Sequence, residues 1–268
     1  MGAGAPAPSY DPDAQAFFNA VTGGGDTLTS TEENAVNDLV VGLKADGIWS
    51  KFVALYPFVG GTASAHKWNL MNPVDTDAAF RMTFVGGWTH DAFGCTGNDL
   101  NTGGNTHYAP TSQGAAGNNF HMSVYCNGGT TGGNASYDMG GYDGSNDWAL
   151  IIEYNNASAP FTHYVNFLGL NYQTAQSNNY QGLWVANRDL GNSGFSELYE
   201  NTSRIINASQ VAGMLTTPIG LGCSWRGNVT DPSGRRYALA TIGLGFDSTE
   251  EANYYDRVLT YETALSRN

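Results

Sequence analysis

The sequence contains few charged residues, and few basic ones in particular. Asp, Glu, Lys and Arg together make up 13% of its 268 residues, which is roughly half the usual share in a globular domain. Lys and Arg number 11 against 24 Asp and Glu, so the formal net charge is −13. Binding to the phosphates of a nucleic acid needs clustered Lys and Arg. The composition therefore argues against nucleic acid as a partner.

Long apolar runs are also missing. No stretch is long enough to span a bilayer, and we therefore expect a soluble protein without membrane insertion. Residues 1–10 are rich in Gly, Ala and Pro, and they have neither the basic start nor the apolar run of a signal peptide. We interpret them as a flexible arm.

Cysteine is scarce. The three cysteines, Cys95, Cys126 and Cys223, are widely spaced and odd in number, which fits neither a disulfide framework nor a zinc knuckle. Buried thiols are the favoured interpretation. One disulfide with one free thiol remains an alternative.

Sequence patterns of common catalytic sites are absent. The chain has no Gly-x-Ser-x-Gly nucleophile elbow and no phosphate-binding Gly-rich loop. Its histidines show no ligand spacing such as His-x-His or His-x-x-x-His, and we expect them on the surface or in loops. They are His66, His90, His107, His121 and His163.

Glycine and aromatic residues, in contrast, are abundant. The chain has 35 Gly, 41% hydrophobic residues and 12% aromatic residues, enough for one main core. With so few charges, much of the surface must consist of Gly, Asn, Ser and Thr. This composition suits short strands joined by turns better than a helical bundle, whose surface needs Lys and Glu. It predicts a mainly β protein.

The N-terminal part nevertheless has helical signals. Asp11-Pro12-Asp13 places a capping residue before a proline at the first helical position. Ser30 with Glu33 has the spacing of a capping box, and apolar residues then recur at helical intervals up to Asp46-Gly47. Further helical turns are expected over 48–56. Residues 11–61 are thus predicted to form a helical segment.

From about residue 62 the pattern becomes that of strands. Apolar and polar residues alternate over 80–84 and again over 120–125, which predicts half-buried strands with His121 and Ser123 on the polar side. A final capping-box spacing, Ser248 with Glu251, predicts a short C-terminal helix over 248–266. Further strands are predicted over 148–154, 164–170, 183–186, 197–199, 205–206, 219–224 and 237–244. Many short strands separated by turns indicate an antiparallel β-sandwich or jelly roll.

Three stretches in the second half follow a family pattern. They are Gly-Leu-Trp-Val-Ala-Asn-Arg at 182–188, Glu-Leu-Tyr-Glu-Asn at 197–201, and Tyr-Ala-Leu-Ala-Thr-Ile-Gly-Leu-Gly-Phe at 237–246, which leads into Ser-Thr-Glu-Glu. Their order resembles the concanavalin A-like, laminin-G-like jelly rolls over residues 62–268, including the C-terminal helix. The resemblance implies an antiparallel β-sandwich. One departure is Thr202, which stands where the family's hairpin has glycine.

The stretches 11–18, 47–51 and 55–61 are similar to the segment that precedes such a jelly roll in structural proteins of tailed bacteriophages. The resemblance implies a virion protein, a fibre, tail or capsid-surface component assembled in the host cytoplasm. Residues 11–61 would then serve attachment to other virion proteins and to copies of the chain itself. The sandwich would face outward for contact with a glycan or a host surface. A free-standing carbohydrate-binding lectin is the alternative, followed by a glycan hydrolase.

A glycan hydrolase needs two carboxylates about 5 to 10 Å apart on either side of the scissile bond. The Glu-x-Asp-x-x-Glu pattern of jelly-roll glucanases does not occur in this sequence. Glu197 and Glu200 come nearest to it, but their separation of three residues places them on opposite faces of a strand, one of them solvated or in the turn. Glu153 is expected to face solvent. We therefore predict no enzymatic activity.

One loop has the composition of a calcium site. Asp143, Asn146 and Asp147 lie in an acidic, glycine-bearing loop of the kind that binds Ca²⁺ in lectin-like sandwiches, although the same residues also form ordinary turns. No other cofactor is expected. Aromatic residues near turns could stack on a sugar, but none stands out as a binding residue: Trp88, Tyr108, Tyr142, Tyr172, Tyr180 and Trp225.

Overall fold

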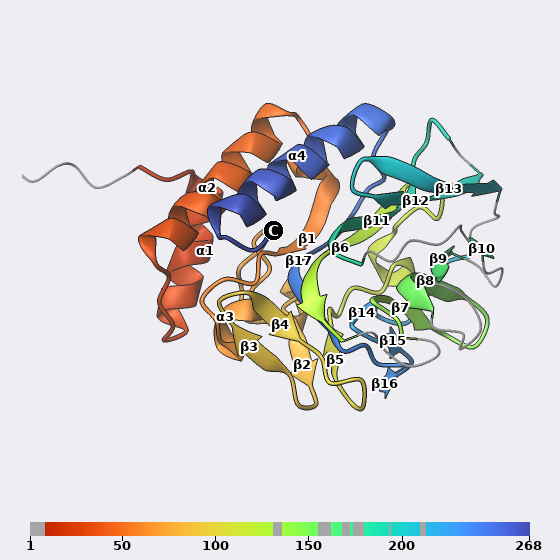
Figure 1. Cartoon of the computed structure of the whole chain (residues 1–268), viewed down its shortest axis with the longest axis horizontal. Coiled ribbons are helices and arrows are strands. Elements are labelled where there is room, and N and C mark those ends of the chain that lie inside the picture. The colour runs from red at the N-terminus through yellow and green to blue at the C-terminus, as the bar shows by residue number, and fades with distance from the viewer. Residues whose placement is uncertain are drawn as a thin grey trace, which may run out of the picture.

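The computed structural model describes residues 9–130, 136–154, 162–167, 172–173, 180–192, 194–209 and 213–268. Two β-sheets pack face to face, and helices from both ends of the chain lie together on one side of the sandwich (Figure 1). The predicted class, a mainly β sandwich with N-terminal helices and a C-terminal helix, is confirmed.

Sheet A contains eight strands within the described ranges. Its neighbours are antiparallel and run in the order β13 (Ser203–Ser209), β12 (Phe195–Glu200), β11 (Gly182–Arg188), β6 (Phe120–Gly129), β17 (Arg235–Gly243), β4 (Gly94–Thr96) and β3 (Thr89–Asp91), and β1 (Phe52–Tyr56) also pairs with β17.

Sheet B contains nine strands in the part of the chain that the structure covers. The order is β10 (Tyr172–Gln173), β9 (Thr162–Asn166), β8 (Asp147–Tyr154), β7 (Met139–Tyr142), β14 (Gly220–Leu221), β5 (Gly103–Asn105) and β2 (Thr83–Val85). A short hairpin of β15 (Ser224–Trp225) and β16 (Val229–Thr230) joins the sheet where β15 lies parallel to β7. The predicted strand over 219–224 is thus divided between β14 and β15.

The main core lies between the two sheets, and every second side chain of a strand points into it. On β6 the inward side chains include Phe120, Met122 and Val124, and on β8 they are Trp148, Leu150 and Ile152. Removing such apolar area from water contributes about 25 cal/mol per Å².

A second core lies between the outer face of sheet A and the helices. These are α1 (Pro12–Gly23), α2 (Ser30–Ala45) and α4 (Ser248–Ala264), and shorter turns occur at α3 (Ala63–His66) and at the 3-10 segments Trp49–Lys51, Asp77–Ala79 and Thr111–Gln113. Val36 of α2 and Val258 of α4 meet Leu239 of β17 in this core. Arg257 of α4 also holds Asp46, just after α2, through Nε–Oδ2 and Nη2–Oδ1 contacts of 2.7 and 2.9 Å. Residues 11–61 and the sandwich therefore share a hydrophobic core.

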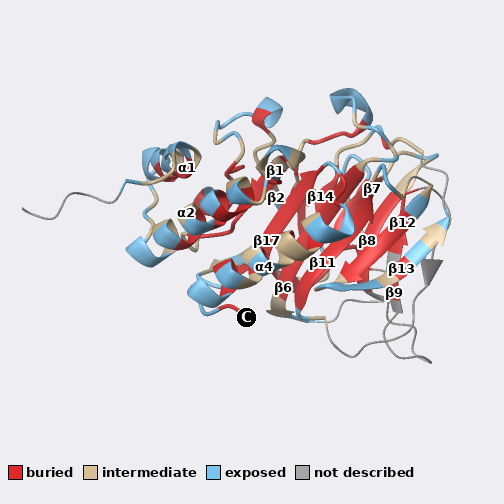
Figure 2. Ribbon diagram, turned by 90° about the horizontal axis from the view of Figure 1, so that it is seen from above, coloured by how far each residue is buried: buried red, intermediate tan, exposed pale blue. Residues whose placement is uncertain are grey.

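The helices change the environment of β6. Residues 120–126 are all buried, so β6 is not the half-buried strand that the alternation predicts (Figure 2). The polar side chains find partners beneath α4, where Ser123 Oγ lies 2.8 Å from the Tyr254 hydroxyl and 2.6 Å from Thr241 Oγ1. The prediction that the polar side of β6 faces solvent is wrong because α4 covers it.

Both predicted capping boxes are displaced by one residue. The N-cap of α2 is Thr29, whose hydroxyl accepts from the backbone amide of Glu32 at 3.2 Å. The N-cap of α4 is Asp247, with Glu250 as its partner. Ser30 and Ser248 are instead the first helical residues, because the better-placed Thr and Asp side chains precede them.

Two further elements differ from prediction. Of the helical turns predicted over residues 48–56, a 3-10 turn forms at 49–51, but residues 52–56 are a strand, since β1 pairs with β17 and Leu55 lies opposite Thr241. The strand predicted from residue 80 begins at Thr83, because Phe80 has a left-handed backbone (φ 59°) that ends a 3-10 turn. In both places the tertiary structure overrides the secondary structure that the local periodicity predicts. None of the helices in the described ranges has the length and apolar character needed to cross a bilayer.

Candidate functional site

The outer face of sheet B is the sheet face that α1, α2 and α4 leave uncovered, since these helices lie on the side of sheet A (Figures 1 and 2). Alternation along β8 places Asp147, Ala149 and Ile151 on this outer face, opposite the inward Trp148 and Leu150. Tyr137 packs with Ala149 and Ile151 in a small apolar cluster separate from the main core.

Asp147 is the polar centre of this face. The Tyr137 hydroxyl donates to both of its carboxylate oxygens, at 3.2 and 3.1 Å, and Asn166 Nδ2 lies 3.4 Å from Oδ2. Burial raises the pKa of Asp147, and the hydrogen bond from Tyr137 opposes that rise. The carboxylate thus has few donors from the described residues for its roughly four acceptor positions.

The β15–β16 hairpin adds an ion pair to the same region. Arg226 Nη2 lies 2.9 Å from Asp231 Oδ2, and the guanidinium stands 4.8 Å from the centre of the Tyr142 ring. Both charged side chains are more than a third exposed, at 38% and 36%. Asp231 has a left-handed backbone (φ 50°), a conformation that Asp tolerates. We call Tyr137, Tyr142, Asp147, Arg226 and Asp231 the hairpin cluster.

The predicted calcium residues have different roles. Asp143 Oδ1 accepts from the amides of Ser145 and Asn146 at 3.0 and 2.7 Å, and Oδ2 accepts from the amide and hydroxyl of Thr216, both at 2.9 Å. Burial would raise the pKa of Asp143, but these backbone hydrogen bonds lower it. With these four hydrogen bonds the Asp143 carboxylate stabilises the turn, and its oxygens are not directed to a cation. Among the described residues no group of three His, Cys, Asp or Glu side chains is placed to hold a metal ion.

Three of the five histidines are buried, contrary to the expectation of surface or loop positions: His66, His121 and His163. His121 shows why, because its Nδ1 lies 2.6 Å from the Leu244 carbonyl and its Nε2 lies 2.9 Å from Thr241 Oγ1. Burial lowers the pKa of His121 to about 3, so the ring is neutral. His121 is structural, because Thr241 of β17 and the Leu244 carbonyl just after it replace solvent.

Glu197, the nearest approach to a catalytic carboxylate, is also buried. It accepts from Asn187 at 2.9 Å, from Asn192 at 2.7 Å and from Arg204 at 2.8 Å. Glu200 is half-buried at the end of β12, and the side chain of Glu153 lies outside the described residues. Glu197 therefore joins β11, β12 and β13 instead of facing a cleft.

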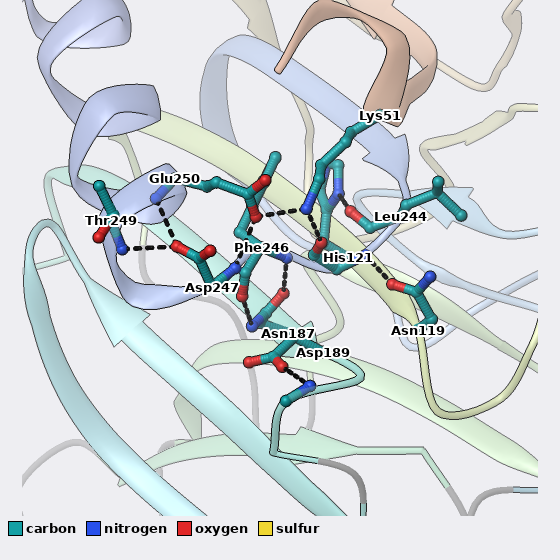
Figure 3. A network of polar contacts seen from close by, with 12 residues as sticks. Lys51, Asn119, His121, Asn187, Asp189, Leu244, Phe246, Asp247, Thr249 and Glu250 are labelled. Atoms are coloured by element: carbon teal, nitrogen blue, oxygen red, sulfur yellow. Dashed lines mark hydrogen bonds and ion pairs between the residues drawn. The ribbon is translucent and has the colours of Figure 1, made fainter. Parts of the chain in front are cut away.

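A polar network next to Glu197 fastens the start of α4 to sheet A (Figure 3). Asn187 donates to the Phe246 carbonyl at 2.8 Å and accepts from the Phe246 amide at 2.9 Å. Lys51 Nζ donates to the Gly245 carbonyl at 2.8 Å and also contacts Glu250. We assign this network to stability.

The cysteines are buried and unbonded, as the favoured interpretation predicts. Cys95 of β4 and Cys126 of β6 pair with Tyr237 from opposite sides of β17. Two strand spacings of about 4.8 Å separate them, beyond the roughly 6.8 Å limit between the Cα atoms of a disulfide.

The aromatic residues near turns are mostly structural. Tyr108 and Trp225 are buried, Trp88 packs on Tyr237, Tyr180 lies under Arg235, and Tyr142 belongs to the hairpin cluster. The side chain of Tyr172 is not among those described. The sequence shows nothing that distinguishes Tyr137 or links Arg226 to Asp147, because their proximity depends on the parallel contact of β15 with β7.

No family model and no curated protein matches the chain. Solved structures do. Domain 4 of AbnA, an extracellular arabinanase from Geobacillus stearothermophilus, solved with arabinotriose, is 11% identical and has a TM-score of 0.50, and the match covers 76% of this chain and 98% of that domain. A Trypanosoma rangeli sialidase mutant is 10% identical with a TM-score of 0.56, over 87% of this chain and 39% of the sialidase. A Ruminococcus gnavus sialidase module, CBM40, is 15% identical with a TM-score of 0.41, over 59% of this chain and 95% of the module.

At these identities the likeness concerns the fold. This chain spans well under half of the sialidase and nearly all of the arabinanase domain. The fold is thus similar to that of the arabinanase domain and of part of the sialidase.

Proposed function

We propose that this chain is a non-catalytic carbohydrate-binding β-sandwich whose ligand contacts the hairpin cluster. The observation that carries the proposal is that Asp147 lies within electrostatic range of the Arg226–Asp231 pair on the sheet face without helices. Sugar recognition needs fixed polar groups for hydroxyls and apolar or aromatic surface for the ring faces. Tyr137 and Tyr142 supply the aromatic part.

Two structural neighbours that were solved with sugars support a carbohydrate ligand. The arabinanase domain was solved with arabinotriose, and another Trypanosoma rangeli sialidase structure (TM-score 0.52) was solved with sialic acid. A carbohydrate ligand is therefore expected here, but at identities near 10% neither its identity nor the position of its site is carried over from these neighbours.

Binding is preferred to hydrolysis for a reason of charge and hydrogen bonding. A glycosidase pairs a protonated carboxylic acid with an accessible second carboxylate. Glu197 has its oxygens taken by Asn187, Asn192 and Arg204, which leaves it no such role. Membership of a virion and contact with copies of the chain stay predictions from the sequence resemblance, and co-purification with phage particles would test them.

The test is a glycan array with the full chain, followed by calorimetry on the ligands it identifies. Asp147→Asn keeps the shape and the Tyr137 contact but removes the charge, and we expect affinity to fall about tenfold or more, since a hydrogen bond to a charged group contributes about 1.5–3 kcal/mol. Asp38→Asn, on the exposed side of α2, is the matched control and should leave affinity unchanged.

Two results would refute the proposal. One is an array without any bound glycan while the chain is folded by circular dichroism. The other is binding that Asp147→Asn and Asp38→Asn affect equally. Release of reducing ends from a bound oligosaccharide would refute its non-catalytic part.

A further inference from the structure

The hairpin cluster has more acidic than basic side chains. It contains two carboxylates, Asp147 and Asp231, and a single base, Arg226. Arg226 is already paired with Asp231 at 2.9 Å and stacked on Tyr142. The cluster therefore has a net negative charge within a chain of formal charge −13.

We propose that the hairpin cluster selects uncharged glycans and rejects sialylated or uronic-acid glycans. This inference rests on the proposed function and narrows its ligand class.

The first argument is the supply of hydrogen-bond donors. A carboxylate accepts and does not donate, and among the described residues Asp147 receives one shared hydroxyl and one long amide contact of 3.4 Å. Sugar hydroxyls donate and are neutral, so they complete the Asp147 shell. A ligand carboxylate brings only acceptors to the same place.

The second argument is the state of Arg226. An arginine that captures an anionic sugar offers its guanidinium edge to the ligand carboxylate in a two-pronged contact. Here Nη2 is directed to Asp231, Nε lies 3.4 Å from Ser224 Oγ, and one ring face is against Tyr142. Arg226 can still donate a single hydrogen bond to a hydroxyl oxygen. Asp147 can accept a hydrogen bond from a neighbouring hydroxyl, so the two side chains together suit two adjacent hydroxyls of a sugar.

The experiment uses matched pairs of glycans that differ only by an acidic sugar, such as lactose and sialyllactose, together with neutral arabinotriose. Binding of the full chain is measured at low and at high salt. We expect the neutral member of a bound pair to bind at least tenfold more tightly at low salt. The difference should shrink at high salt, because salt screens repulsion between exposed charges.

Asp231→Asn tests the charge argument directly. Asn tolerates the left-handed backbone at this position, so the variant should fold, and thermal unfolding verifies it. The variant should lose discrimination against the acidic member, whereas Asp38→Asn should keep it. Tighter binding of the sialylated member by the unaltered chain overturns this inference and leaves glycan binding standing. Unchanged discrimination in Asp231→Asn also overturns it, and failure to bind any glycan overturns both proposals.

Discussion

Glu251 is a buried carboxylate with a strongly raised pKa, and its replacement gives a sharp test of the fold. It lies in the first turn of α4 with a side chain that is 1% exposed. Its Oε1 has no hydrogen-bond partner among the described residues. Burial, and then the nearby Glu197, raises its pKa from 4.5 to about 8. The folded protein therefore holds a proton on Glu251 at neutral pH.

The raised pKa makes stability depend on pH. Between 4.5 and about 8 the folded state keeps the Glu251 proton while the unfolded chain loses it, so this contribution is fully present at acid pH and declines as pH rises. Each pH unit in this window lowers the free energy of unfolding by about 1.4 kcal/mol. From about pH 5.5 to about pH 7.5 the loss is about 3 kcal/mol.

Glu251→Gln removes this titration and keeps the side chain's size. At about pH 5.5 both proteins carry a neutral group, and their stabilities should agree within about 1 kcal/mol. At about pH 7.5 the variant should be more stable than the unaltered chain by about 3 kcal/mol. Urea unfolding followed by tryptophan fluorescence across this range measures the difference. Asp38→Asn, an exposed carboxylate on α2, is the control and should run parallel to the unaltered chain.

The refuting result is equally simple. If the stability difference between Glu251→Gln and the unaltered chain does not change with pH, Glu251 does not hold a proton in the folded state. The buried junction between α4 and sheet A would then have to be hydrated or differently packed.

Two further predictions concern glycine packing and thiol burial. Gly245→Ala should lower the free energy of unfolding by about 3 kcal/mol or more, or prevent folding, because its Cβ would stand 1.9 Å from the Arg188 carbonyl oxygen. The Cβ of Gly23→Ala meets nothing within 4 Å, so this variant should be neutral or stabilising by up to about 1 kcal/mol. Thermal unfolding measures both variants. A drop in Tm of equal size in both variants would contradict this packing. The three thiols should resist a thiol reagent in the native protein and react on denaturation. Burial raises the pKa of Cys223 to about 12 and the pKa values of Cys95 and Cys126 well above the usual value. Rapid labelling of the native protein would contradict their burial.

Several elements could be predicted from local sequence signals alone. The alternation over residues 120–125 predicts the strand β6, and the apolar run over residues 148–154 predicts the strand β8. The helix over residues 30–45 follows from its apolar spacing, although the capping side chain is one residue earlier than predicted. Each of these depends on a chain's neighbours within a few residues.

Other features depend on partners that lie far along the chain and could not be predicted from local patterns. The alternation of residues places His121 and Ser123 on the polar side of their strand. In the structure α4, more than a hundred residues later, covers them and supplies Tyr254 as a partner. Residues 52–56 become a strand because β17 offers a free edge for hydrogen bonds. Asp143 and Asp147 are neighbours in the sequence but have different surroundings. The β15–β16 hairpin places Arg226 near Asp147 on the outer face of sheet B, whereas Asp143 accepts hydrogen bonds within its turn. Burial and charge depend on what lies across space, and a one-dimensional pattern does not contain that information.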